Sequence, residues 1–536
     1  MKNFFLRKSA FAGLLLGTVA LASCEKFLDA NNNPNTPESI DYTLTLPNAL
    51  NRPLVSVGSN LNILGNLWTG NWAQASDYLF YVPQQQYNLT PASYDGVWQN
   101  LYAGSLADLR YMELQAQTAG NKNYVAIAKI MQAYNFQILT DGWGDIPFTD
   151  ILSADPRIPL TNLTPKYDPS QTVYEGIIKL LDDGIGQIDD TAIKPSANDI
   201  YFGGNMSRWR RFANTLKLRV YMRQSRARSS YAQAGIQAMQ AAGAQFLGVD
   251  ENVAGNPGYT NTLLKTNPLN ADIGFGPTGG ETSGYRATRA NVFAVNYLKQ
   301  SGDTLRLKAL YAPRVNTTNI ARNFYGAASG ISSSYAPGAS GQVSPLGPKI
   351  LDVLTGPLNP VYLMTSAESF FLRAEAVERG YLTGNAKTLY QSGVEQSFTL
   401  LGYTSAQAAA YYNSSVTNPT PANYYGISAT ATLNSTPGRL DLKIVSPKYD
   451  DATTTEKRIE AIITQKWIAN NGFNGYESWN EFRRTGYPSG NYISLSARQR
   501  AFPVRLPYPQ SEVNNNPNTP ASGVTLFTPR LFWDID

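Results

Sequence analysis

Aromatic, amide and carboxylate side chains are concentrated in one early stretch of the sequence, residues 66–87. The flat C–H faces of sugar rings stack on aromatic rings, and amides and carboxylates form hydrogen bonds with hydroxyl groups. This combination predicts a binding surface rather than a catalytic centre. The candidate binding residues are Asn71, Trp72, Gln74, Asp77, Tyr78 and Tyr81.

Two later segments that are rich in Gly and Ser, residues 251–290 and 322–349, carry further candidates. An aromatic side chain beside glycine in a loop is less easily explained by core packing than one on a helix, and loops often carry binding residues. We therefore expect Tyr285, Arg286 and Tyr325 to contribute to the same surface, with Tyr335 in a similar setting.

The early stretch also has a purely structural interpretation. Trp68, Trp72 and Leu79 fit the spacing of a helix whose aromatic side chains face the core. The residues alone leave this interpretation and the binding surface equally open.

Several kinds of catalysis are excluded by composition. The chain has no histidine, which removes Ser-His-Asp and Cys-His nucleophiles and His-ligated zinc. Its single cysteine, Cys24, can form neither an internal disulfide nor a Cys-rich metal site. Composition leaves open oxygen-ligated Ca²⁺ or Mg²⁺ and Lys or Ser/Lys nucleophiles. No twelve-residue calcium loop or phosphate loop is present, and we expect no metal at the binding site and no cofactor. A pair of catalytic carboxylates stays open, but no particular pair stands out.

The first 23 residues have the pattern of a bacterial lipoprotein signal peptide. Lys2, Arg7 and Lys8 precede a short apolar segment, residues 10–21, which is too short to span a bilayer. The sequence Leu-Ala-Ser-Cys then ends at Cys24, where a lipobox needs its acylated cysteine. Without the three basic leader residues, the net charge falls from +5 to about +2. No Lys/Arg block that would suggest nucleic-acid binding is left.

Helical periodicity dominates the rest of the chain. Apolar residues recur at i, i+3, i+4 and i+7 in several stripes, which predicts amphipathic helices. The stripes cover residues 98–112, 127–138, 174–188, 209–220, 363–377, 387–400 and 459–467. They come in pairs with short breaks, as in helix–turn–helix repeats of the tetratricopeptide kind, although the strict 34-residue period of those repeats is absent.

A run of basic residues is interleaved with the apolar stripe of residues 208–223. We expect this run to form a charged helix face that is solvated and joined by salt bridges, rather than a site for an anionic ligand. Arg483 and Arg484 are expected to pair structurally with Glu477 and Glu481. Trp143, Trp467 and Trp479 are expected to be core residues.

Motifs in a fixed order along nearly the whole chain carry a family resemblance. They lie at residues 24–29, 139–148 (LTDGWGDIPF), 209–223 (WRRFANTLKLRVYMR), 367–380, 464–467, 479–488 (WNEFRRTGYP) and 505–517. In this respect the chain resembles the SusD/RagB-like nutrient-binding lipoproteins of Bacteroidetes outer membranes.

The resemblance implies a mostly α fold, with a scaffold of tetratricopeptide-like helix pairs and a loop-rich second half packed on it. It implies a single domain over residues 24–536, in which residues 24–53 form a tether and lead-in. It further implies a surface-exposed outer-membrane protein, anchored through Cys24, that captures oligosaccharides or peptides without catalysis and caps a TonB-dependent transporter barrel. In such proteins the ligand lies where an early loop meets loops of the second half, which would unite residues 66–87 with Tyr285, Arg286 and Tyr325.

Two other functions are compatible with the residues. One is a carboxylate-dependent glycan hydrolase, and the other is an adhesion or assembly scaffold built from helical repeats. Binding without release of reducing sugar, and co-purification with a barrel protein, would separate the three possibilities.

Overall fold

The computed structural model describes residues 41–155, 164–314, 323–331, 339–416, 432–433, 436–437 and 442–535. The predicted signal peptide, Cys24, most of the predicted lead-in and Tyr335 lie outside the described residues.

Helices form most of the first half, as the apolar stripes predict. The longest, α7, ends at Trp143 because Gly144 takes a positive φ of 82° that favours glycine. The elements of this half are η1 (Tyr42–Leu44), α2 (Leu46–Val55), the π-helix η2 (Ser56–Asn60), α3 (Leu61–Trp68), β1 (Trp72–Gln74), α4 (Val82–Gln85), α5 (Asp95–Gln99), the π-helix η3 (Asn100–Leu106), α6 (Ala107–Thr118), α7 (Lys122–Trp143), α8 (Thr149–Ser153), α9 (Ser170–Gln187), α10 (Met206–Arg223) and α11 (Ser229–Ala241).

The second half alternates helices with long loops. Its elements are β2 (Val253–Gly255), α12 (Pro268–Ile273), α13 (Ser283–Ala287), β3 (Thr288–Ala290), α14 (Val292–Gln300), α15 (Thr304–Leu310), η4 (Gly356–Leu358), β4 (Val361–Met364), α17 (Ser366–Glu378), α18 (Ala386–Leu400), α19 (Ser405–Tyr412), β5 (Thr432–Leu433), β6 (Thr436–Pro437), η5 (Tyr449–Asp451), α20 (Thr455–Asn470), α21 (Gly475–Thr485) and α22 (Gln510–Asn515).

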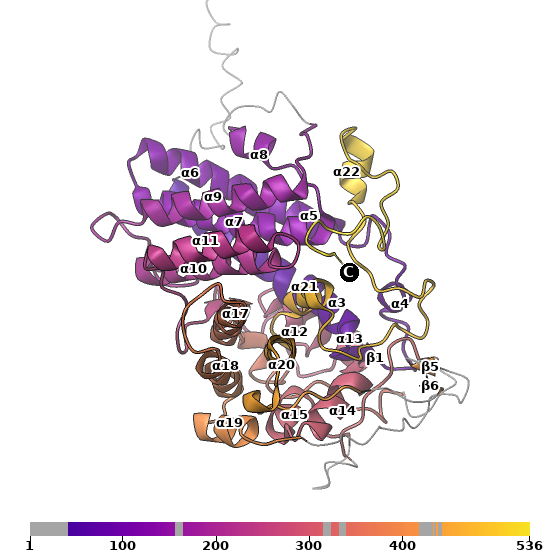
Figure 1. Cartoon of the computed structure of the whole chain (residues 1–536). Coiled ribbons are helices and arrows are strands. Elements are labelled where there is room, and N and C mark those ends of the chain that lie inside the picture. Colours follow the sequence, from indigo (N-terminus) through magenta and orange to yellow (C-terminus); the bar gives the residue numbers. More distant parts are fainter. Residues whose placement is uncertain are drawn as a thin grey trace, which may run out of the picture.

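Neighbouring helices pack as pairs in the order of the chain. Helix α6 lies against α7, α9 against α7 and α10, and α10 against α11 and α17, and α17 then pairs with α18. Figure 1 shows α6, α7, α9, α10 and α11 side by side, with α17, α18 and α19 continuing the stack. The prediction of a mostly α fold on a tetratricopeptide-like helix-pair scaffold is therefore confirmed.

The described strands form three two-stranded antiparallel ribbons, β1 with β3, β2 with β4, and β5 with β6. The first two ribbons connect segments that are far apart in the sequence. Because an isolated ribbon is marginally stable, these two depend on the helices around them.

An early helix, α3, crosses a late helix, α21, at close range. A Cβ atom at Gly65 would overlap the backbone of Gly475, so only glycine allows this approach. Asn62 fixes the crossing, because its Nδ2 donates to the carbonyl of Gly472 (2.9 Å) and its Oδ1 accepts from the amide of Gly475 (2.7 Å). One hydrophobic core accordingly contains residues from Leu46 to Trp533.

A buried ion network connects five of the helices. Arg219 on α10 binds Glu368 on α17 (2.8 Å), and Arg223 binds Glu477 (2.5 Å) and Glu481 (2.8 Å) on α21. Its other members are Asp141 on α7, Glu375 on α17, Lys466 on α20 and Arg484 on α21. We call these nine residues the ion network.

The prediction of a solvated basic face on residues 208–223 is wrong for two of its arginines. The side chains of Arg219 and Arg223 are at most 2% exposed. They belong to the face of α10 that packs on α17 and α21, and carboxylates of those helices neutralise them. The predicted pairing of Arg484 with Glu481 is confirmed, and Trp143, Trp467 and Trp479 are buried as expected.

The ion network makes stability depend on pH in the acid range. Burial alone would raise the pKa of Glu477, but Arg219, Arg223 and Lys466 lower it from 4.5 to about 2. A carboxyl whose pKa is lower in the folded state contributes stability above its unfolded pKa and loses it as pH falls through the folded pKa. We therefore expect the free energy of unfolding to decrease between about pH 4.5 and pH 2, measured by denaturant titration. The Glu477→Gln variant should show a shallower decrease, and an identical pH profile would contradict this assignment.

Candidate functional site

The ribbon of β1 and β3 brings the early stretch of candidates to the later loops. Trp72 pairs with Ala290, Ala73 with Arg289 and Gln74 with Thr288. Side chains alternate between the two faces of a ribbon, so Trp72 and Gln74 share one face and Ala73 and Arg289 share the other. All residues of the two strands are buried, so neither face of the ribbon itself reaches the surface.

Four of the predicted binding residues are buried, on or next to the core side of the ribbon. The indole nitrogen of Trp72 donates to Oδ1 of Asn471 (3.0 Å), and Nδ2 of Asn71 donates to Oδ1 of Asn66 (3.0 Å). The hydroxyl of Tyr81 lies 2.8 Å from that of Thr288. Trp72 and Asn71 are 0% exposed, Tyr81 is 5% and Gln74 is 6% exposed, so these side chains offer a ligand little or no surface.

Gln74 organises the loop that follows β1. Its Oε1 accepts from the amides of Phe80 (2.8 Å) and Tyr81, and its Nε2 donates to the carbonyl of Tyr78 (2.6 Å). In the loop that these hydrogen bonds close, Leu79 is 88% exposed to solvent and Phe80 is 47% exposed. The interpretation of Leu79 as a core residue is therefore wrong, because α3 ends at Trp68 and the chain no longer follows helical spacing.

Asp77 ties this loop to the second half of the chain. Its carboxylate accepts from the amide and the hydroxyl of Ser340, both at 2.7 Å, and Nε of Arg289 donates to the carbonyl of Ser340 (3.0 Å). Burial would raise the pKa of Asp77, but the Ser340 hydrogen bonds and the charge of Arg289 lower it. Asp77 is thus an ionised carboxylate at the surface.

Tyr285 and Arg286 on α13 border the same place. The guanidinium of Arg289 donates to the carbonyl of Tyr285 (2.6 Å), and the ring of Tyr285 packs on that of Phe275 with centroids 4.5 Å apart. Arg286 is exposed and binds Glu281 (3.1 Å). We use the name loop surface for Asp77, Tyr78, Leu79, Phe80, Tyr285 and Arg286.

Tyr325 lies beside the outer face of the ribbon, where it is half-buried against Ala73. The guanidinium of Arg314 lies 4.2 Å from its ring centroid, and the ammonium of Lys299 lies 5.1 Å from it. Burial and the charge of Arg314 lower the pKa of Lys299 to about 8. These two distances show that the ring of Tyr325 is already in contact with two basic side chains.

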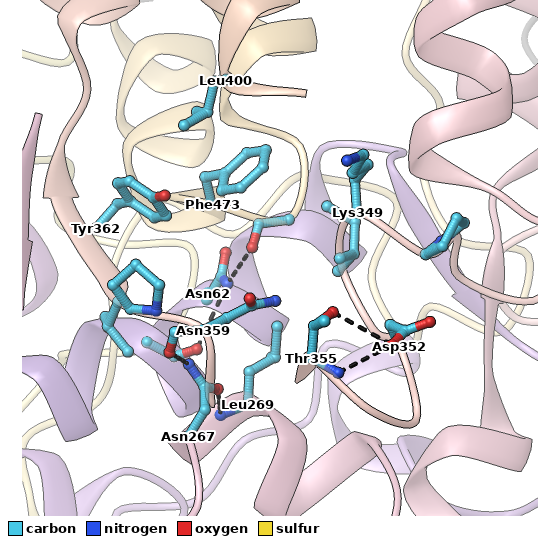
Figure 2. Close-up of a pocket in the computed structure, with 16 residues that line it drawn as sticks. Asn62, Asn267, Leu269, Lys349, Asp352, Thr355, Asn359, Tyr362, Leu400 and Phe473 are labelled. Carbon is cyan, nitrogen blue, oxygen red and sulfur yellow. Dashed lines mark hydrogen bonds between the residues drawn. The ribbon is translucent and has the colours of Figure 1, made fainter. Parts of the chain in front are cut away.

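A cavity of about 480 Å³ opens near the other end of α3, and the sequence did not predict it. Figure 2 shows Tyr362, Phe473 and Leu400 on one side of it and Lys349 and Asp352 on the other. The rings of Tyr362 and Phe473 meet edge to face at 5.4 Å, and Asn62 and Asn267 lie below them. Its size is within the range of small-molecule sites. Because its walls come from five separate segments of the chain, no local motif marks it.

Within the described part of the chain, no group of three or more His, Cys, Asp or Glu side chains is placed to hold a metal ion. Over the same residues, no helix is long and apolar enough to cross a membrane.

A stack of helix pairs carries loops gathered at its side. This arrangement defines a class of proteins in which a helical scaffold presents a surface made by loops. Within that class, the chain belongs to the SusD-like family. The family model, described as "Starch-binding associating with outer membrane", matches residues 34–509. This match confirms the resemblance found in the sequence.

Solved structures of SusD homologues share the fold over nearly the whole chain. A chitin-binding homologue from Flavobacterium johnsoniae is 23% identical, with 92% of this chain and 99% of that chain covered and a TM-score of 0.71. A homologue from Bacteroides uniformis is 22% identical, with the same coverage and a TM-score of 0.73. A third, from Bacteroides vulgatus, is 23% identical, covers 91% and 97%, and has a TM-score of 0.71. No curated protein matches the chain.

Proposed function

We propose that this protein is a non-catalytic binding protein on the outer surface of the outer membrane. It captures oligosaccharides and delivers them to a TonB-dependent transporter, which it caps. Family membership supports the carbohydrate and the outer membrane, since the family description names both. A peptide ligand and a role as a hydrolase or as an assembly scaffold are the alternatives that the experiments below would detect.

The loop surface carries this proposal. Tyr78, Phe80 and Tyr285 are partly exposed. Arg289 connects the two parts of the surface, because it donates to the carbonyls of Tyr285 and of Ser340, the residue that Asp77 binds. Exposed aromatic side chains have a cost in water unless a ligand covers them, and a sugar ring fits this mixture of flat apolar and polar groups. The hydrogen bonds of Gln74 and Asp77 hold the loop in place before a ligand arrives, which reduces the entropy lost on binding.

Stacking on the loop surface should account for most of the affinity. We expect Tyr78→Ala and Phe80→Ala each to weaken oligosaccharide binding by about 1–3 kcal/mol, the range for stacking on other flat rings. The affinity of the unaltered protein should be micromolar to millimolar, about −4 to −8 kcal/mol, because a delivery protein must release its cargo. Isothermal titration with maltooligosaccharides and chitooligosaccharides measures both values.

Two matched variants control this experiment. Tyr231→Ala removes a half-buried tyrosine ring on α11, far from the loop surface in the chain, and should leave affinity unchanged. Tyr362→Ala removes a ring from the cavity of Figure 2. If Tyr362→Ala abolishes binding while Tyr78→Ala and Phe80→Ala do not, the oligosaccharide binds in the cavity and the loop surface is the wrong site.

Membrane attachment should depend on Cys24. Two or three acyl chains on this residue would hold the protein on the membrane, since a single chain binds only reversibly. We expect Cys24→Ala to move the protein from the membrane fraction to the soluble fraction after cell fractionation. Unchanged membrane retention would show that the anchor lies elsewhere.

The transporter partner and the absence of catalysis need separate measurements. Affinity purification of the tagged protein from detergent-solubilised membranes should recover a large barrel protein. Incubation with each bound oligosaccharide should release no reducing sugar. Recovery of other scaffold components in place of a barrel, or release of sugar by the purified protein, would favour the corresponding alternative function.

A further inference from the structure

A second, smaller cavity lies between α11, α17 and α18, away from the loop surface and from the cavity of Figure 2. Its volume is about 410 Å³, which is enough for one sugar residue. Among the described residues that line it, Arg373 is the only charged one. The apolar part of its wall includes Phe246, Leu382 and Leu389, and the polar part includes Thr383 and Thr388.

Arg373 differs from every other arginine in the described part of the chain. Its guanidinium lies over the rings of Phe370 (5.1 Å) and Phe246 (5.7 Å), so two aromatic side chains hold it in position. It makes no hydrogen bond and no ion pair with any described residue, whereas each of the other described arginines makes at least one. Arg379, the residue that follows α17, shows the usual situation, with Glu375 at 2.8 Å.

A half-buried cation without a counter-charge is unfavourable, because burial removes water without replacing its hydrogen bonds. Burial lowers the pKa of Arg373, and no carboxylate acts against it. The guanidinium can donate two parallel hydrogen bonds, which match the two oxygens of a carboxylate. A ligand that brings such a group would supply both the missing charge and the missing acceptors.

The remaining polar side chains of the cavity are also available. The hydroxyls of Thr383 and Thr388 make no hydrogen bond to any described residue. Thr383 lies in the loop before α18 and Thr388 in its first turn, and both line the cavity together with Arg373. Hydroxyls that can both donate and accept suit the hydroxyl groups of a sugar. One cation in a small cavity favours a single negative charge over a phosphate dianion.

We propose that this cavity binds a carboxylate-bearing sugar residue, of the uronic acid class, with Arg373 holding the carboxylate. The site is independent of the loop surface, which has several aromatic side chains and which we assign to oligosaccharides generally. It would let the protein bind acidic glycans at a second point.

Titration with sodium glucuronate, glucose and sodium acetate tests the proposal on the mature protein. We expect glucuronate to bind with a dissociation constant of order millimolar, and glucose and acetate at least about tenfold more weakly, because each has only half of the recognised groups. Arg373→Gln should weaken glucuronate binding at least about tenfold, and Arg373→Lys, which keeps the charge without the paired donors, should weaken it less.

Lys387→Gln is the matched control, because it removes one positive charge from the same end of α18 outside the cavity and should leave the affinity unchanged. Thr388→Val should also weaken glucuronate binding, which keeps the test decisive if Arg373→Gln does not fold. Equal binding of glucuronate and glucose, equal binding of glucuronate and acetate, or unchanged affinity in Arg373→Gln and Thr388→Val would each overturn the proposal. Oligosaccharide binding at the loop surface should persist in all these variants, so failure here is distinguishable from failure there.

Discussion

Replacing Arg223 with methionine is expected to lower the free energy of unfolding by about 3–5 kcal/mol, the cost of removing one partner from a buried ion pair. The side chain of Arg223 is 0% exposed and lies within 3.7 Å of Asp141, 2.5 Å of Glu477 and 2.8 Å of Glu481. Methionine fills a similar space but leaves three buried carboxylates with one cation fewer. Denaturant titration followed by tryptophan fluorescence measures the loss.

Arg211→Met on the same helix is the matched control. Arg211 binds Glu251 at 2.5 Å, but both side chains are more than 20% exposed, and such a pair contributes about 1 kcal/mol or less. A second variant that combines Arg223→Met with Glu477→Gln should recover part of the lost stability, because it removes one of the unpaired charges. Equal losses for Arg223→Met and Arg211→Met would show that the ion network does not behave as a buried one.

Trp72→Ala is the second change from which we expect a large effect, again about 3–5 kcal/mol in the free energy of unfolding. The indole is completely buried and its nitrogen bonds to Asn471, so truncation leaves a cavity and an unsatisfied amide. The variant should bind oligosaccharide with unchanged affinity once it is folded. Thermal unfolding and titration of the same preparation test both statements.

Trp72→Phe separates the two causes of that loss. It keeps most of the ring volume but removes the hydrogen bond to Asn471, so we expect a smaller decrease, of about 1–3 kcal/mol. A Trp72→Ala protein that is as stable as the unaltered chain but no longer binds oligosaccharide would instead show that Trp72 contributes to the binding surface.

The scaffold could be predicted from the sequence because its information is local. The apolar stripes of α9 and α18 repeat within each helix, and their periodicity indicates which side is buried. The same reasoning failed for Arg219 and Arg223. Whether an arginine on a helix faces water or a carboxylate depends on what packs against it, and Glu477 is more than 250 residues away in the sequence.

The candidate site could be predicted only in its location. The sequence marks residues 66–87 as rich in binding-type side chains, and the ribbon of β1 and β3 does place that stretch beside α13. The sequence does not show that Trp72 and Gln74 face the core, because the two-residue alternation begins only after α3 ends at Trp68. Leu79 and Phe80 were missed as exposed residues, although Gly70 before them and Pro83 after them mark a loop.

The crossing of α3 with α21 has a consequence for how the chain is made. Synthesis proceeds from the N-terminus, so Asn62, Gly65 and the arginines of α10 emerge long before the glycine and the carboxylates of α21 that they require. Until that late segment arrives, charged groups destined for the interior must stay in water, and the early helices cannot complete their packing. A chain that ends before residue 475 would therefore lack the backbone that Asn62 contacts and the carboxylates that neutralise Arg223, and we expect proteases to digest it faster than the full chain.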